Sequence, residues 1–194
     1  MKRKLYNPMN LVLLVLIPLI AFSGTEQKAS ESYYEQLKSL LTRKTLKVRP
    51  NASKRDVNLI EVEKGAAGVL FGASMDDVVA IWGKPCGIDT YRSRDIWSLY
   101  IGACRFGFID NQLVSVSIHS ATLKKAHLGN GISFKSSYND VKSAFGEPIE
   151  ATDYNLKFVT KNGYVIRFHF VADTSSIGKR KLISIKISHP DSGE

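Results

Sequence analysis

The sequence predicts an α+β protein with two tandem units, each packing a short helical motif on an antiparallel β-meander, preceded by an N-terminal amphipathic helix. Two observations predict this fold class. The stretch FGASMDDVVAIWGKP at 71–85 returns as FKSSYNDVKSAFGEP at 134–148, an offset of 63 residues. Each copy is then followed by segments in which apolar and polar residues alternate, as they do in strands. An internal repeat of this length indicates a duplicated structural unit.

The first 23 residues have the anatomy of a secretory signal peptide. Three basic residues at 2–4 precede a twelve-residue apolar run at 11–22. A helix of that length rises about 18 Å, which is well short of the ~30 Å hydrocarbon core of a bilayer. We therefore expect an exported protein, periplasmic or secreted, with cleavage after Ser23. The alternative is an uncleaved inner-membrane anchor formed by residues 5–23.

Composition and charge narrow the class of protein. The chain is 44% hydrophobic and 23% charged, which is typical of a globular protein and not of a disordered one. Its formal net charge is +9, or about +6 without the basic start. The charges are scattered in pairs and form no dense stripe with aromatic residues, so we expect no nucleic-acid partner. A weak contact with an anionic membrane surface fits this charge better.

Residues 24–64 are predicted to contain an N-terminal helix and a linker. A helix over about 31–46 is indicated by apolar residues spaced three and four apart, namely Tyr34, Leu37, Leu40 and Leu41. Pro50 lies beyond the end of this helix. The segment VNLIEVE at 57–63 alternates moderately and is either a short strand or an extended lead-in.

Each copy of the repeat predicts a helix of two turns or slightly more. A serine, Ser74 or Ser137, is placed to cap the helix, and an aspartate three residues later can bond back to the cap. A glycine then ends the helix and a proline two residues further on prevents its continuation. These residues are Asp77, Gly83 and Pro85 in the first copy and Asp140, Gly146 and Pro148 in the second.

Alternating residues after each helix predict three or four antiparallel strands. The clearest case is 182–188, where isoleucines alternate with serine and lysine. Turn sequences such as IDNQL and TKNGY separate the strands. We expect a first helix-plus-sheet repeat at 65–120, a linker at 121–130 and a second repeat at 131–189.

The two cysteines, Cys86 and Cys104, favour a structural disulfide in an exported chain. In the chain-entropy model such a short loop stabilises a protein by ~3 kcal/mol. The alternative is a metal or redox pair, for which the close C-x-x-C spacing is missing.

The pattern G-x-x-F-G-x-S-x-x-D-V-x-x-x-x-G-x-P at 68–85 resembles the signature of the small outer-membrane assembly lipoproteins of the SmpA/OmlA (BamE-like) family. A tandem of such units also resembles the β-lactamase-inhibitor-protein fold. In that fold a cysteine just after the helix pairs with one in a following strand, as Cys86 and Cys104 are placed here. The resemblance covers about residues 66–188 and implies an exported, non-enzymatic scaffold with a protein-binding surface.

No catalytic, cofactor-binding or metal-binding residue is predicted. The four histidines have no metal-ligand spacing, and the chain has neither a G-x-S-x-G nucleophile turn nor a glycine-rich phosphate loop. Candidate partner-binding residues lie in the first repeat, where tyrosine, tryptophan and arginine are typical of interface hot spots. They are Tyr91, Arg92, Arg94 and Trp97.

These observations favour an exported, non-enzymatic protein-binding or envelope-assembly module with a protein partner in the cell envelope. Two alternatives stay open. One is a hydrolase acting on envelope material, which would need His119 or His169 beside a carboxylate in a pocket. The other is a membrane-tethered structural protein that keeps its N-terminal segment.

Overall fold

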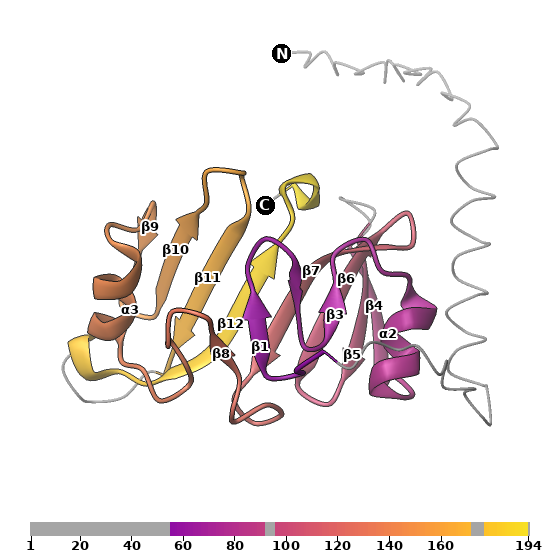
Figure 1. The fold of residues 1–194 in the computed structure, drawn as a ribbon, viewed down its shortest axis with the longest axis horizontal. Coiled ribbons are helices and arrows are strands. Elements are labelled where there is room, and N and C mark those ends of the chain that lie inside the picture. Colours follow the sequence, from indigo (N-terminus) through magenta and orange to yellow (C-terminus); the bar gives the residue numbers. More distant parts are fainter. Residues whose placement is uncertain (1–54, 92–95, 172–176, 194) are drawn as a thin grey trace, which may run out of the picture. The chain divides into compact units, whose positions relative to one another are not determined.

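The computed structural model describes residues 55–91, 96–171 and 177–193 (Figure 1). Two sheets and two eight-residue helices form in this part of the chain. In chain order the elements are β1 (Leu59–Glu61), β2 (Gly65–Ala66), β3 (Val69–Leu70), α2 (Met75–Trp82), β4 (Gly87–Tyr91), β5 (Ile96–Ile101), β6 (Cys104–Ile109), β7 (Gln112–His119), β8 (His127–Leu128), α3 (Tyr138–Phe145), β9 (Glu150–Ala151), β10 (Asn155–Val159), β11 (Val165–Phe170), η1 (Ile177–Lys179), β12 (Leu182–Ser188) and η2 (Pro190–Ser192).

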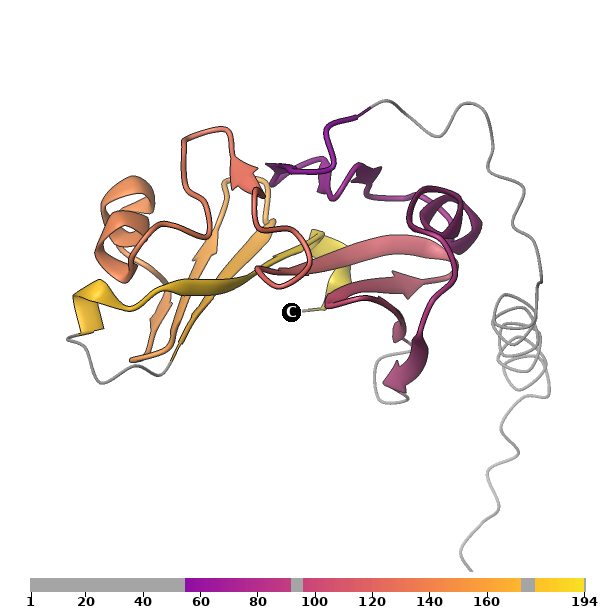
Figure 2. The same ribbon diagram turned by 90° about the horizontal axis from the view of Figure 1, so that it is seen from below.

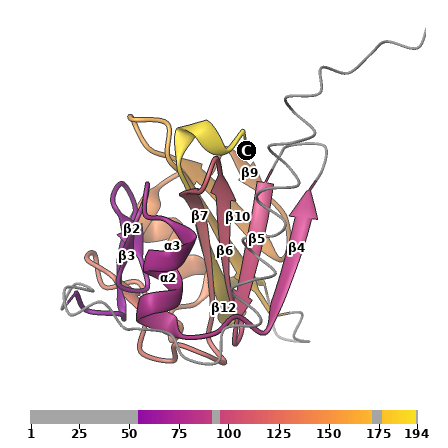
Figure 3. The ribbon, with the colours of Figure 1, turned by 90° about the vertical axis from the view of Figure 1, so that its right-hand side faces the viewer.

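The larger sheet has eight strands in the order β4-β5-β6-β7-β12-β11-β10-β9, and every neighbouring pair is antiparallel. The smaller sheet has the order β3-β2-β1-β8, in which β1 and β8 are parallel. Both helices and the smaller sheet lie on the same face of the larger sheet (Figures 2 and 3).

The prediction of an α+β protein with two separate helix-plus-sheet units is therefore wrong. The protein is mostly β, and the strands that follow the two helices do not form two separate meanders. They join in one sheet because β7 pairs with β12 from Ser115↔Ser188 to His119↔Ser184. In separate units β7 and β12 would be edge strands with unpaired backbone groups, and their pairing satisfies those groups. The segment 57–63, predicted as a short strand or an extended lead-in, contains β1. The two-residue strands β2, β3 and β8 that complete the smaller sheet were not predicted.

The two helices themselves begin and end where the sequence predicts. Ser74 Oγ accepts a hydrogen bond from the Asp77 amide at 3.2 Å, and Asp77 Oδ2 accepts one from the Ser74 amide at 3.1 Å. Ser137 and Asp140 form the same reciprocal cap at 3.3 and 2.8 Å. Each helix ends at a glycine with positive φ, 84° at Gly83 and 80° at Gly146, a conformation that other residues seldom adopt.

One hydrophobic core extends along the covered face of the larger sheet. Its largest buried rings are Phe106 and Phe108 on β6 and Phe168 and Phe170 on β11. Helix α2 packs Trp82 against Phe106, and α3 packs Phe145 against Phe158 and Phe168. Because these residues belong to one cluster, the two helices cover a shared core.

The predicted signal peptide at 1–23 and the predicted helix at 31–46 lie outside the described residues, as does the alternative membrane anchor at 5–23. Of the helices in the described ranges, none is both long and apolar enough to cross a membrane.

Candidate binding groove

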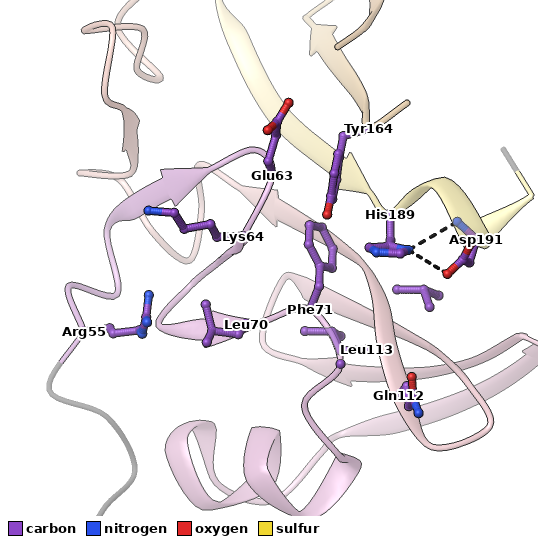
Figure 4. A pocket seen from close by; sticks show the side chains of 12 residues that line it. Arg55, Glu63, Lys64, Leu70, Phe71, Gln112, Leu113, Tyr164, His189 and Asp191 are labelled. Carbon is purple, nitrogen blue, oxygen red and sulfur yellow. Dashed lines mark hydrogen bonds and ion pairs between the residues drawn. The ribbon is translucent and has the colours of Figure 1, made fainter. Parts of the chain in front are cut away.

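An open groove of about 360 Å³ lies beside the ends of β3, β7 and β12 (Figure 4). Segments far apart in the sequence supply its walls: the β1–β2 turn, the residues after β3, the start of β7, the start of β11 and the η2 turn. The lining residues are Arg55, Glu63, Lys64, Leu70, Phe71, Gly72, Gln112, Leu113, Val114, Tyr164, His189 and Asp191.

Three rings converge in this groove. Tyr164 lies edge to face with His189 at a centroid distance of 5.2 Å, and Phe71 lies 5.7 Å from each of them. All three side chains are half-buried, whereas the neighbouring Leu70 side chain is 38% exposed. The groove therefore has an aromatic and aliphatic surface that is partly exposed.

Backbone hydrogen bonds hold the aromatic residues in place. The Gly72 amide donates to the Leu113 carbonyl at 2.9 Å, which fixes Phe71 against the start of β7. The His189 amide donates to the Val114 carbonyl at 2.7 Å. Gly65, the first residue of β2, permits the close approach of β2 to β3, because a Cβ on this residue would lie 2.1 Å from the Val69 carbonyl oxygen.

His189 also caps the η2 turn. Its Nδ1 accepts a hydrogen bond from the Asp191 amide at 3.3 Å and lies 3.2 Å from Asp191 Oδ2. The second contact becomes an ion pair when the imidazole is protonated. This role fixes the ring orientation and gives His189 a structural function in the groove wall.

The remaining wall of the groove carries both basic and acidic side chains. Arg55 and Lys64 each contact the Glu61 carboxylate, at 3.3 and 2.9 Å. The hydrogen bond from Lys64 lowers the pKa of Glu61 below its usual value, with a smaller contribution from Arg55. Glu63 accepts a hydrogen bond from Asn162 at 2.8 Å, which ties the β1–β2 turn to the β10–β11 turn. The charged side chains that border the groove are thus paired, and the border is neither strongly positive nor strongly negative.

Among the candidate partner-binding residues, Trp97 is the one whose side chain is described, and it does not line this groove. Trp97 lies on β5 opposite Phe108 and is half-buried against the core. Tyr91 ends β4, where its backbone pairs with Ile96, and its side chain is outside the described part. Arg92 and Arg94 are also outside it.

The predicted Cys86–Cys104 disulfide is not formed, and both cysteines are free. Cys104 opens β6 opposite Ile101 of β5, whereas Cys86 precedes β4 on the other side of β5. The two cysteine Cα atoms are therefore separated by two strand spacings of about 4.8 Å each. This separation exceeds the ~7 Å limit for Cα atoms that a disulfide can join. The exposed Cys86 thiol instead donates to the Tyr100 carbonyl at 3.1 Å, and burial raises the pKa of the Cys104 thiol.

The groove lining, all within the described part of the chain, includes no serine, threonine or cysteine. His119 and His169, the histidines that a hydrolase was expected to use, lie elsewhere: His119 Nδ1 accepts from the Ala121 amide, and His169 Nδ1 contacts Asn155 Oδ1 at 2.7 Å. Residues 55–91, 96–171 and 177–193 contain no group of three or more His, Cys, Asp or Glu side chains that could hold a metal ion.

Sequence reasoning missed the groove because its residues come together only in the folded chain. The repeat gave no signal of the groove, because the residue concerned is the same in both copies. Phe71 and Phe134 occupy matching positions, but Phe134 is buried at 9% exposure while Phe71 lines the groove.

No family model matches the chain, and no curated protein matches it. Among solved structures, it is similar to an extracellular protein containing a SCP domain from Bacillus anthracis str. Ames, with 12% identity and a TM-score of 0.48. The match covers 78% of this chain and 51% of that protein, so this chain spans about half the length of its structural neighbour.

Proposed function

We propose that this protein is an exported, non-enzymatic binding module of the cell envelope and that its groove holds an extended segment of a protein partner. The single observation that carries the proposal is the open surface formed by Phe71, Tyr164 and His189 beside the exposed Leu70. Apolar and aromatic side chains in a concave site provide the anchor on which peptide recognition depends.

Polar groups around this surface suit a polypeptide. Gln112 carries an amide that can both donate to and accept from a peptide backbone. Glu63 and Asp191 offer carboxylates, and Arg55 and Lys64 offer cations, on the remaining walls. A hydrolase is less well supported, because the histidine in the groove caps a turn and neither His119 nor His169 lines it.

Selection of random peptides displayed on phage tests the proposal, with the purified protein as the immobilised target. Enriched peptides should share an apolar or aromatic anchor residue and should lose affinity for Leu70→Glu. Ile149→Glu is the matched control, since Ile149 is 64% exposed and does not line the groove. The proposal fails if no peptide is enriched or if both variants bind the enriched peptides equally well.

A further inference from the structure

The charged side chains of the groove are distributed unevenly around its aromatic rings. Arg55 and Lys64 lie on the side of Leu70 that faces away from Asp191 (Figure 4). Two carboxylates, those of Glu63 and Asp191, line the part of the groove that holds the rings. The groove therefore has a basic end and an aromatic, acidic end, and the charge of a ligand determines which end can hold it.

The basic end is already neutralised by a carboxylate of the protein itself. Glu61 accepts hydrogen bonds from Arg55 at 3.3 Å and from Lys64 at 2.9 Å. The hydrogen bond from Lys64 holds the pKa of Glu61 below its usual value, so this carboxylate is ionised at neutral pH. An acidic ligand would have to compete with Glu61 for both cations, which argues against an acidic peptide.

The two carboxylates at the aromatic end have uncharged neighbours instead. Glu63 accepts a hydrogen bond from the side-chain amide of Asn162 at 2.8 Å. Asp191 Oδ2 lies 3.2 Å from His189 Nδ1, and this nitrogen is unprotonated while it accepts from the Asp191 amide. Among the residues that the structure describes, no lysine or arginine forms an ion pair with either carboxylate. The Asp191 side chain is 80% exposed, so a cation from solution can reach it.

The rings beside these carboxylates add a second attraction for a cation. Phe71 and Tyr164 are half-buried and line the groove, with their centroids 5.7 Å apart. Tyr164 and Asp191 both contact His189, which places this ring and this carboxylate close together. A cation is attracted to the electron-rich face of an aromatic ring. A guanidinium suits such a site best, because it is planar, stacks on rings and can donate two parallel hydrogen bonds to a carboxylate.

The start of β12 shows the same combination of groups within the protein itself. The guanidinium carbon of Arg180 lies 4.5 Å from the centroid of the Tyr154 ring, and Arg180 Nη1 lies 3.9 Å from Asp153 Oδ2. A tyrosine, a carboxylate and a guanidinium thus form one cluster there. At the groove, Tyr164 and Asp191 supply the tyrosine and the carboxylate, and no arginine or lysine of the described ranges lies over the Tyr164 ring.

We propose that the aromatic, acidic end of the groove binds a basic side chain of the partner segment, arginine in preference to lysine, next to the apolar residue that packs on Leu70. This inference rests on the proposed function, because it assigns a sequence preference to the same peptide-binding groove. The guanidinium stacks on Phe71 or Tyr164 and donates hydrogen bonds to Asp191. Glu63 borders the same rings and adds to the attraction. Segments with an acidic residue at this position are rejected, since both carboxylates repel them.

The test selects displayed random peptides in parallel on the wild type and on the double variant Glu63→Gln/Asp191→Asn. Both changes keep the size of the side chain, and glutamine can still accept a hydrogen bond from Asn162. Peptides enriched on the wild type should carry a basic residue, more often arginine than lysine, at a fixed distance from an apolar anchor. Peptides enriched on the double variant should keep the anchor and lose the basic residue. Glu147→Gln is the matched control, since the Glu147 side chain is 85% exposed and does not line the groove.

Synthetic peptides then measure the coupling between the basic residue and the two carboxylates. The sequence most enriched on the wild type is compared with a copy in which glutamine replaces its basic residue. This replacement should weaken binding to the wild type about tenfold and binding to the double variant less than about twofold. The glutamine copy should bind both proteins equally well, which also shows that the double variant is folded.

Failure of this inference can be distinguished from failure of the proposed function. Enriched peptides that share an apolar anchor but show no basic residue, or an acidic one, would overturn the site for a basic side chain and leave the peptide groove standing. A preference for arginine that persists on the double variant would do the same. No enriched peptide, or peptides that bind Leu70→Glu as well as the wild type, would overturn the proposed function and this inference with it.

Discussion

Tyr164 and His189 lie edge to face with their ring centroids 5.2 Å apart, and this contact joins the start of β11 to the turn after β12. Phe71 touches both rings and brings in the segment after β3. The groove is therefore built by the same contacts that hold three distant parts of the chain together.

Replacing Tyr164 tests this arrangement. Tyr164→Ala removes both ring contacts and should lower the free energy of unfolding by about 1–3 kcal/mol, because each aromatic pair contributes about 0.5–1.5 kcal/mol beyond its buried area. Tyr164→Phe keeps the ring and should stay within about 0.5 kcal/mol of the wild type. Urea unfolding measures both variants, and equal losses for the two would contradict a role of the ring contacts.

The helix cap at Ser137 and Asp140 makes stability depend on pH. Hydrogen bonds from the Ser137 amide and hydroxyl hold the pKa of Asp140 below its usual value of 3.8. A carboxyl group whose pKa is lower in the folded state stabilises the fold above its unfolded pKa, and this contribution is lost as the pH falls through the folded pKa. The wild type should therefore be more stable than Asp140→Asn near neutral pH, and the difference should shrink below pH 3.8. Unfolding curves at several pH values measure this, and a constant difference would rule out the linkage.

The two cysteines should react as free thiols of different accessibility. Cys86 is exposed, while Cys104 is buried and burial raises its pKa, which reduces the reactive thiolate. A thiol reagent should modify Cys86 rapidly in the native protein and Cys104 only slowly, and both should react after denaturation without reductant. Denatured protein with no reactive thiol would show that a disulfide forms after all.

The pairing of β7 with β12 predicts slow hydrogen exchange at the centre of the larger sheet. Amides of these two strands should be among the most protected, because each strand has a partner on both sides. Ile187→Ala should lower the free energy of unfolding by about 2–5 kcal/mol, since Ile187 is 1% exposed, and unfolding should stay a single transition. Rapid exchange in β7 and β12, or two separate transitions, would instead indicate two independent units.

The features that depend on neighbouring residues were predictable from the sequence. A serine, an aspartate three residues later and a closing glycine determine each helix locally, and both helices have these bounds. Alternation likewise marks the strands, since Ile185 and Ile187 face the core and Lys186 faces away. Alternation does not specify which strand supplies the hydrogen bonds, however, so the joining of β7 to β12 could not be predicted.

Features that depend on three-dimensional neighbours were mispredicted or missed. An even number of cysteines suggested a disulfide, but β5 lies between Cys86 and Cys104. Trp97 was singled out as an interface candidate by its residue type; it is half-buried against the core, and its contact with a partner stays a prediction. The groove joins Phe71, Tyr164 and His189 across most of the described chain, and no local pattern links them.

Photo-crosslinking tests the central claim, that the groove holds a protein partner, most directly. A photoreactive phenylalanine analogue would replace Leu70 in the groove, or Ile149 as an exposed position outside it, in the cells that produce the protein. Irradiation should give one discrete crosslinked protein species from position 70, and this species should be absent from position 149. No crosslinked species from position 70, or the same species from both positions, would contradict the groove as the binding site.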